Sequence, residues 1–147
     1  MRIPSLLALL AIVACSSGDP VKNIPPEPTV VGTWALQTYN GGALPYTGSQ
    51  NANGSINRVE SGSITLDNSR RYVLEIVIVN TLGTTTTPQN FNEVGSYAGS
   101  VTSGVIMKPN DLSGGTDGRT YQQVPVTISG TTLSFAQQGK ILTFTKK

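Results

Sequence analysis

From Val30 onward the chain is divided into short apolar segments by turn-forming residues, and this division sets the class of fold. Within the segments apolar and polar residues alternate, as they do in Leu133-Ser134-Phe135 and in Leu142-Thr143-Phe144. A period of two is typical of a strand with one buried face, and no segment of the domain has the apolar spacing of a helix. The sequence therefore predicts an all-β domain over residues 30–147.

The order of these segments predicts an antiparallel meander. We expect about eight strands, at Val31–Tyr39, Arg58–Leu66, Arg70–Asn80, Phe91–Ala98, Val101–Lys108, Arg119–Ile128, Thr131–Phe135 and Lys140–Lys146. Residues 44–54, 81–89 and 109–118 are polar and are predicted to be loops. Eight consecutive antiparallel strands can close into an up-and-down barrel, and closure removes the exposed sheet edges.

One face of the predicted strands supplies a set of large apolar side chains for the interior of this barrel. Such a set either fills a packed core or lines a cavity that holds a small apolar ligand, and the sequence leaves both open. The predicted interior residues, which are also the candidate ligand-binding residues, are Trp34, Leu36, Ile64, Leu66, Tyr72, Leu74, Ile76, Tyr97 and Ile106.

The first fourteen residues have the pattern of a short export signal. Arg2 precedes an apolar run, and the small residue Ala14 stands before Cys15, the single cysteine of the chain. A run of this length is too short for a membrane-spanning helix, so residues 1–14 are predicted to be a removable signal peptide. Residues 16–29 contain four prolines and no apolar periodicity, which indicates an extended Pro/Ser-rich linker.

The sequence Ile12-Val13-Ala14-Cys15 resembles the bacterial lipobox. The resemblance implies that Cys15 is lipidated and becomes the anchored amino terminus of the mature protein. Two or three acyl chains would make membrane attachment effectively stable. Because Ser16 rather than Asp follows the cysteine, the resemblance further implies an outer-membrane location in the cell envelope.

The segment GTWALQTYNGGALP resembles the opening of bacterial lipocalin-like lipoproteins. Further similarities are SGSITL before a Tyr-bearing strand, Gly95-x-Tyr97, and the closing GTTLSF and KILTFTKK. The resemblance covers residues 30–147 and implies an eight-stranded barrel that binds a small apolar molecule. It also implies that Trp34 plugs the closed end of the barrel beneath a basic side chain, either Lys146 or Lys140.

The composition argues against catalysis, a metal site and nucleic-acid binding. There is no histidine, the net charge is only +2, and aromatic residues make up 6% of the chain. Glu75 and Glu93 could face one cavity, but we expect them on the solvated outer face. In the 109–118 loop, turn formation is favoured over calcium binding for the oxygen-bearing side chains, which are Asn110, Asp111 and Asp117.

The expected protein is a monomeric, membrane-anchored lipoprotein of the cell envelope, without enzymatic activity or cofactor. Its barrel would bind a small apolar or amphipathic ligand. The alternative is an interaction protein with a packed core, whose three long loops contact another envelope component. The two differ in whether the barrel leaves open space for a ligand.

Overall fold

The computed structural model describes residues 29–110 and 123–147, and in this part of the chain every regular element is a strand. The strands are β1 (Gly32–Tyr39), β2 (Gly42–Ala43), β3 (Tyr46–Gln50), β4 (Ile56–Leu66), β5 (Arg71–Leu82), β6 (Thr85–Ser100), β7 (Gly104–Pro109), β8 (Val124–Ser129), β9 (Thr132–Gln137) and β10 (Lys140–Lys146).

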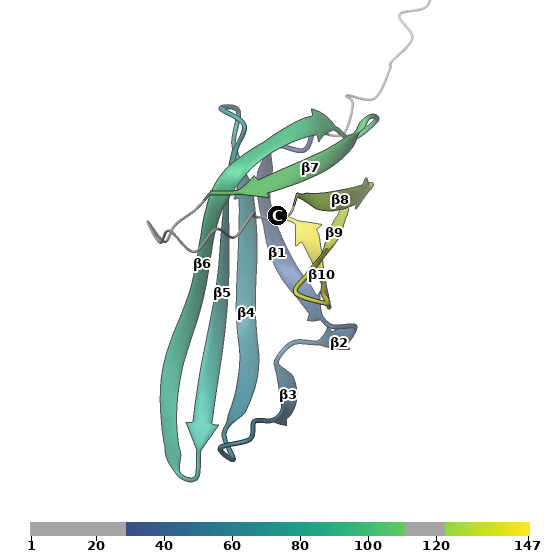
Figure 1. The fold of residues 1–147 in the computed structure, drawn as a ribbon. Helices are drawn as coiled ribbons and strands as arrows, with labels where there is room; N and C mark the ends of the chain where they lie inside the picture. The colour runs from purple at the N-terminus through teal and green to yellow at the C-terminus, as the bar shows by residue number, and fades with distance from the viewer. Residues whose placement is uncertain (1–28, 111–122) are drawn as a thin grey trace, which may run out of the picture.

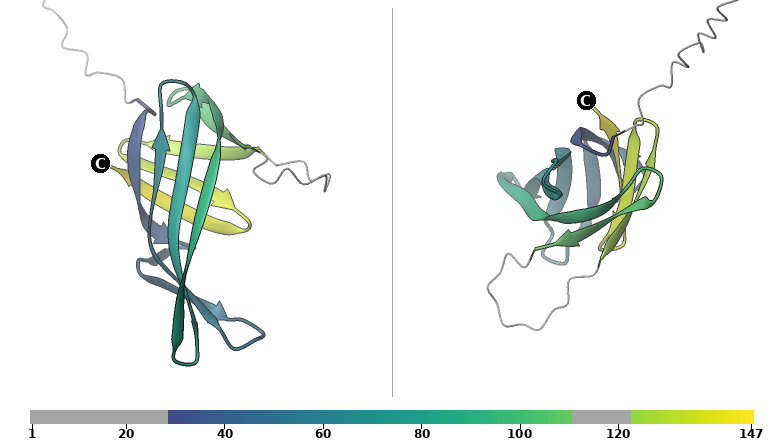
Figure 2. Two further views of the ribbon diagram at one scale, coloured as in Figure 1. Left: turned by 90° about the vertical axis from the view of Figure 1, so that its left-hand side faces the viewer. Right: turned by 90° about the horizontal axis from the view of Figure 1, so that it is seen from above.

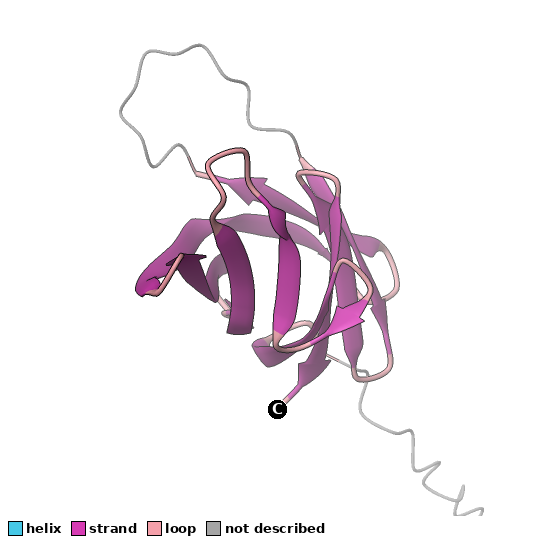
Figure 3. Ribbon diagram, turned by 90° about the horizontal axis from the view of Figure 1, so that it is seen from below, coloured by secondary structure: helices cyan, strands magenta, loops and turns pink. Residues whose placement is uncertain are grey.

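Eight of these strands form a closed antiparallel barrel (Figures 1 and 2), as the sequence predicts. Each strand from β4 to β10 pairs with the next along the chain, and β1 closes the barrel by pairing with both β10 and β4. The short strands β2 and β3 are additions at the edges of β1 and β4. Figure 3 shows the closed ring of strands from the side opposite to the top view in Figure 2.

Two of the three predicted loops are wrong, because they contain strands. Residues 46–50 form β3, and residues 85–89 belong to β6, where they pair with the end of β5. Threonine favours strands, and the run from Thr84 to Thr87 continues the hairpin rather than ending it. Pro88 is tolerated there because β6 pairs with β7 only from Gly95 onward, so its other side is an edge.

The β5–β6 hairpin extends well beyond the barrel (Figure 1) and distinguishes its two ends. The hairpin end also contains Tyr39, at the finish of β1, and the β9–β10 turn at Gln138. The opposite end contains the start of β1 and the β4–β5 turn, and we call it the Trp34 end. Thr29, the first described residue, lies at the Trp34 end, where it lines a hollow together with Val30 and Asn68.

The barrel has a hydrophobic core of its own. In the described part of the chain seventeen apolar side chains are buried, and they form one cluster; the largest that are fully buried are Trp34, Tyr72 and Phe144. Because this cluster lies within residues 29–147, that segment has what it needs to fold by itself.

Eight of the nine predicted interior residues are buried, but the prediction for Ile106 is wrong. Its side chain is 42% exposed, whereas Val105 and Met107 on either side are buried. Residues opposite each other in an antiparallel pair point to the same face. Ile106 lies opposite the exposed Ala98, whereas Met107 lies opposite the buried Tyr97. Because Val105, Ile106 and Met107 are all apolar, the sequence does not show which face of this strand points into the barrel.

Trp34 is enclosed at its end of the barrel. Its indole Nε1 donates a hydrogen bond to the Val30 carbonyl at 3.1 Å, and its side chain is 1% exposed. The Lys146 ammonium lies 5.2 Å from the ring centroid and donates to the Thr29 carbonyl at 2.6 Å. Of the two lysines considered as the basic cover, Lys146 is the one over the ring, while Lys140 begins β10 at the hairpin end.

Candidate functional site

The middle of the barrel is packed, and open space lies at its two ends. Tyr72, Leu74 and Phe144 are inaccessible to solvent in the middle. Most of the predicted interior residues therefore form a core instead of lining a cavity. Two exceptions are Ile76, which lines a hollow at the hairpin end, and Tyr97, which lines one at the Trp34 end.

Three adjacent hollows occupy the hairpin end, and we call them the small, side and outer hollows. The small hollow, of about 110 Å³, lies in the mouth of the barrel and is lined mainly by apolar side chains, namely Tyr39, Ile76, Ile78, Phe91 and Leu142. The side hollow, of about 520 Å³, shares Gln137 and Gln138 with it. The outer hollow, of about 390 Å³, shares Tyr39 and Ile78 with it and reaches β3.

A carboxylate hydrogen-bonded by two neutral side chains lies at this mouth. The Tyr72 hydroxyl donates to Oε1 of Glu93 at 2.7 Å, and Nε2 of Gln137 donates to its Oε2 at 2.6 Å. The three residues come from β5, β6 and β9, so the two bonds connect opposite parts of the wall. We call these residues the polar trio.

The alternation of β6 directs Glu93 inward. Glu93 is in phase with Gly95 and Tyr97, both of which are buried. Gly95 is paired with Tyr72, and a Cβ on Gly95 would collide with the Tyr72 ring and with the Lys108 carbonyl. The absence of a side chain at Gly95 thus lets the Tyr72 ring lie across β6 with its hydroxyl at Glu93.

The polar trio keeps a carboxylate in place with neutral donors. Burial, and then the hydrogen bond to Glu93, raise the pKa of Tyr72 well above its ordinary range, so Tyr72 remains a protonated donor. Among residues 29–110 and 123–147 the ion pair is Arg58–Glu60, and no described Lys or Arg forms a salt bridge with Glu93. The carboxylate thus has hydrogen-bond partners but no charged partner in the described part of the chain.

The side hollow lies where the wall between β8 and β9 is incomplete. The β8–β9 pairing runs from Ser129 to Val126 and ends there, although β8 begins at Val124. Pro125 has no amide hydrogen with which to extend such a ladder. Val124 and Pro125 line the side hollow together with Glu93 and Gln137, and Gln137 also lines the small hollow.

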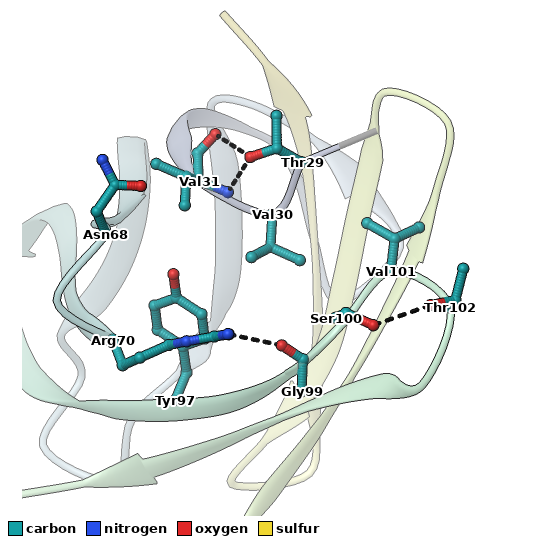
Figure 4. Close-up of a pocket in the computed structure, with 10 residues that line it drawn as sticks. All are labelled: Thr29, Val30, Val31, Asn68, Arg70, Tyr97, Gly99, Ser100, Val101 and Thr102. Atoms are coloured by element: carbon teal, nitrogen blue, oxygen red, sulfur yellow. Dashed lines mark hydrogen bonds between the residues drawn. The ribbon is translucent and has the colours of Figure 1, made fainter. Parts of the chain in front are cut away.

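The Trp34 end holds a separate hollow of about 300 Å³ between the start of β1 and the β4–β5 and β6–β7 turns (Figure 4). Arg70 reaches across it: its Nη1 donates to the Gly99 carbonyl at 2.7 Å, and its guanidinium lies 5.5 Å from the Tyr97 ring centroid. The Tyr97 hydroxyl donates to the Asp67 carbonyl at 2.6 Å. These contacts connect the β4–β5 turn with the β6–β7 turn. The Arg70 guanidinium is thus already bound by groups of the protein itself.

The expectation that both Glu75 and Glu93 face solvent is half wrong. Glu75 is exposed on the outer face of β5, but Glu93 is half-buried and faces the interior. The alternation of β6 around Tyr97 is the signal that could have placed Glu93 inside. Sequence reasoning also missed Gln137, Tyr39 and Phe91, which line the hairpin-end hollows.

Several other predictions concern residues outside the described part of the chain. Cys15 lies there, as do Asp111 and Asp117 of the calcium alternative. Asn110 is described, and its backbone N–H donates to the Val94 carbonyl at 2.9 Å. Within residues 29–110 and 123–147 no three His, Cys, Asp or Glu side chains are grouped as a metal site would require.

The closed eight-stranded barrel is compatible with the lipocalin-like fold that the sequence resembles. In the part of the chain that the structure describes, no helix has the length and apolar character to cross a membrane. No protein-family model, no curated protein and no solved structure matches the chain.

Proposed function

We propose that the protein is a monomeric, non-catalytic binding module of the cell envelope, anchored by lipid at Cys15. In this proposal a small apolar or amphipathic molecule occupies the hollows at the hairpin end. The observation that carries it is the composition of that end: apolar side chains such as Ile78 and Phe91 line the small hollow. Glu93, with its two donors, lines the adjacent side hollow, which shares Gln137 with the small one. Ligand sites are typically concave and apolar, with a few polar groups that fix orientation.

The size of the hollows supports a small ligand. Binding cavities for small molecules are commonly about 300–1,000 Å³. The side hollow, of about 520 Å³, falls in this range, whereas the small hollow, of about 110 Å³, would hold only part of a molecule. A ligand with one apolar chain could occupy both, since they share Gln137 and Gln138.

The position of Thr29 agrees with a tether that leaves the mouth free. Thr29 lies at the Trp34 end, and Tyr39, at the other end of β1, lines the hollows. A lipid anchor on Cys15 would then hold the Trp34 end toward the membrane and point the mouth away from it. We propose the outer membrane, on the basis of Ser16 after the cysteine.

The anchor is tested by substituting its attachment point in the full chain. Cys15→Ser is expected to abolish incorporation of labelled fatty acid and to release the protein from the membrane fraction. Ser16→Ala is the matched control and should remain labelled. Equal labelling of Cys15→Ser and wild type would refute lipidation at this cysteine.

Ligand binding is tested by native mass spectrometry of residues 29–147 after incubation with a membrane-lipid extract. The expected spectrum shows an added mass that disappears on denaturation. Phe91→Ser, in the mouth, should reduce the bound fraction, whereas Val77→Ser, on the outer face of the same strand pair, should not. A bare protein mass with every extract would overturn ligand binding and favour an interaction protein.

A further inference from the structure

We infer that the ligand of the hairpin end carries a positively charged amine, and that Glu93 receives it. This inference rests on the proposed ligand-binding function and specifies the chemical class of the ligand. It predicts a single-chain amphiphile whose ammonium group contacts the Glu93 carboxylate while its apolar chain lies along Phe91, Ile76 and Ile78.

The first argument is the charge of the polar trio. A carboxylate that is partly withdrawn from water is costly unless a cation or strong hydrogen bonds compensate it. Tyr72 and Gln137 supply one neutral hydrogen bond to each oxygen of Glu93, and each oxygen retains a lone pair. Because no described side chain provides a cation here, a cationic ligand would complete the site.

The second argument is the character of the surrounding surface. Neither the small hollow nor the side hollow is lined by a Lys or Arg of the described chain, so no described cation in their linings repels an ammonium group. The Tyr39 and Phe91 rings line the small hollow and offer apolar surface to the chain of the ligand. Phe91 is two residues before Glu93 on β6, so both side chains point to the same face.

The third argument is the access to Glu93. Glu93 and Gln137 both line the side hollow, and Gln137 also lines the small one. An ammonium group can donate to the carboxylate from the side hollow, in addition to or in place of the Gln137 amide. A carboxylate or sulfate head group in the same position would be repelled, which makes the site selective for cations.

The inference is tested by isothermal titration calorimetry of residues 29–147 at pH 7 with three probes of equal chain length. Octylammonium, octanol and octanoate are each used below their aggregation concentrations. Octylammonium is expected to bind tightest and octanoate weakest. Glu93→Gln should weaken octylammonium binding about tenfold or more, strengthen octanoate binding, and leave octanol binding within about twofold.

Glu75→Gln is the matched control, because it removes the same charge from the outer face of the neighbouring strand. It should leave all three affinities unchanged. If wild type binds the three probes equally, or if both variants change octylammonium binding alike, the amine assignment is overturned while ligand binding stands. If no probe binds, the proposed binding function itself fails. The ranking of the probes in wild type decides the question even if Glu93→Gln does not fold.

Discussion

Tyr72 connects the core of the barrel with the mouth, and it makes the stability of the fold sensitive to alkaline pH. Its raised pKa means that the unfolded chain loses the phenolic proton first, near the ordinary value of about 10. Above that pH the unfolded state binds fewer protons than the folded state, so the free energy of unfolding must fall as pH rises.

Tyr72→Phe is therefore expected to flatten the pH dependence above pH 10. Below that value the variant should differ from wild type by a constant offset, because only a hydrogen bond to Glu93 is lost. Above it, the wild type should lose up to about 1.4 kcal/mol more than the variant for each further pH unit. Urea denaturation between pH 8 and pH 11 measures both curves. Parallel curves would show that Tyr72 is not protected from ionisation in the folded state.

Of all single side chains, we expect Trp34 to contribute most to the stability of the folded barrel. Trp34→Ala should lower the free energy of unfolding by about 3–5 kcal/mol, because the neighbouring side chains cannot fill the space of a buried indole. Ile141→Ala, on the outer face of β10 where the side chain is 56% exposed, is the control and should cost less than about 1 kcal/mol. Equal losses in urea denaturation would contradict the burial of Trp34.

The sequence predicts the burial of single residues well where only one face of a strand is apolar. Ile64 and Leu66 are buried as expected, since polar residues flank them on both sides. Ile106 was misplaced because both phases of its strand are apolar. Glu93 was misplaced because its charge was weighed above its position, two residues from Gly95 in the buried phase. The pairing partners that decide such cases are not visible in a single sequence.

At the scale of elements, the sequence identifies strands more reliably than their lengths. The last strand was predicted with its observed bounds, Lys140–Lys146, because turn residues precede it. The β5–β6 hairpin was predicted too short, because its Thr-rich tip has few apolar residues. Its strands continue by pairing with each other, and Asn80 donates a hydrogen bond to the Asn57 side chain at 2.7 Å.

The tip of this hairpin is expected to be dispensable for the barrel. Replacing residues 79–88 by Asn-Gly joins the paired residues Ile78 and Gln89 through a two-residue turn. Because the removed side chains lie outside the core cluster, the free energy of unfolding should change by no more than about 1 kcal/mol. Urea denaturation measures the change. Failure of the shortened chain to fold would show that the tip supports the barrel.

For the whole molecule, the number of strands and their order predicted closure, but the location of open space could not be predicted. Open space depends on where ladders end, such as the β8–β9 pairing that stops at Val126 and leaves the side hollow. It also depends on side chains that meet across the barrel, such as Glu93 and Gln137, 44 residues apart in sequence. Contacts between residues so far apart cannot be predicted from local sequence patterns.

The way in which β1 closes the barrel has a consequence for folding speed. Its pairing with β10 joins Trp34 to Lys146, more than 100 residues away, whereas β4, β5 and β6 pair with sequence neighbours. Local hairpins form in about 1–10 μs, but all-β chains dominated by distant contacts fold in about milliseconds to seconds. We therefore expect the pairing of β10 with β1 to limit the folding rate, and a chain permuted to bring these strands together to fold faster.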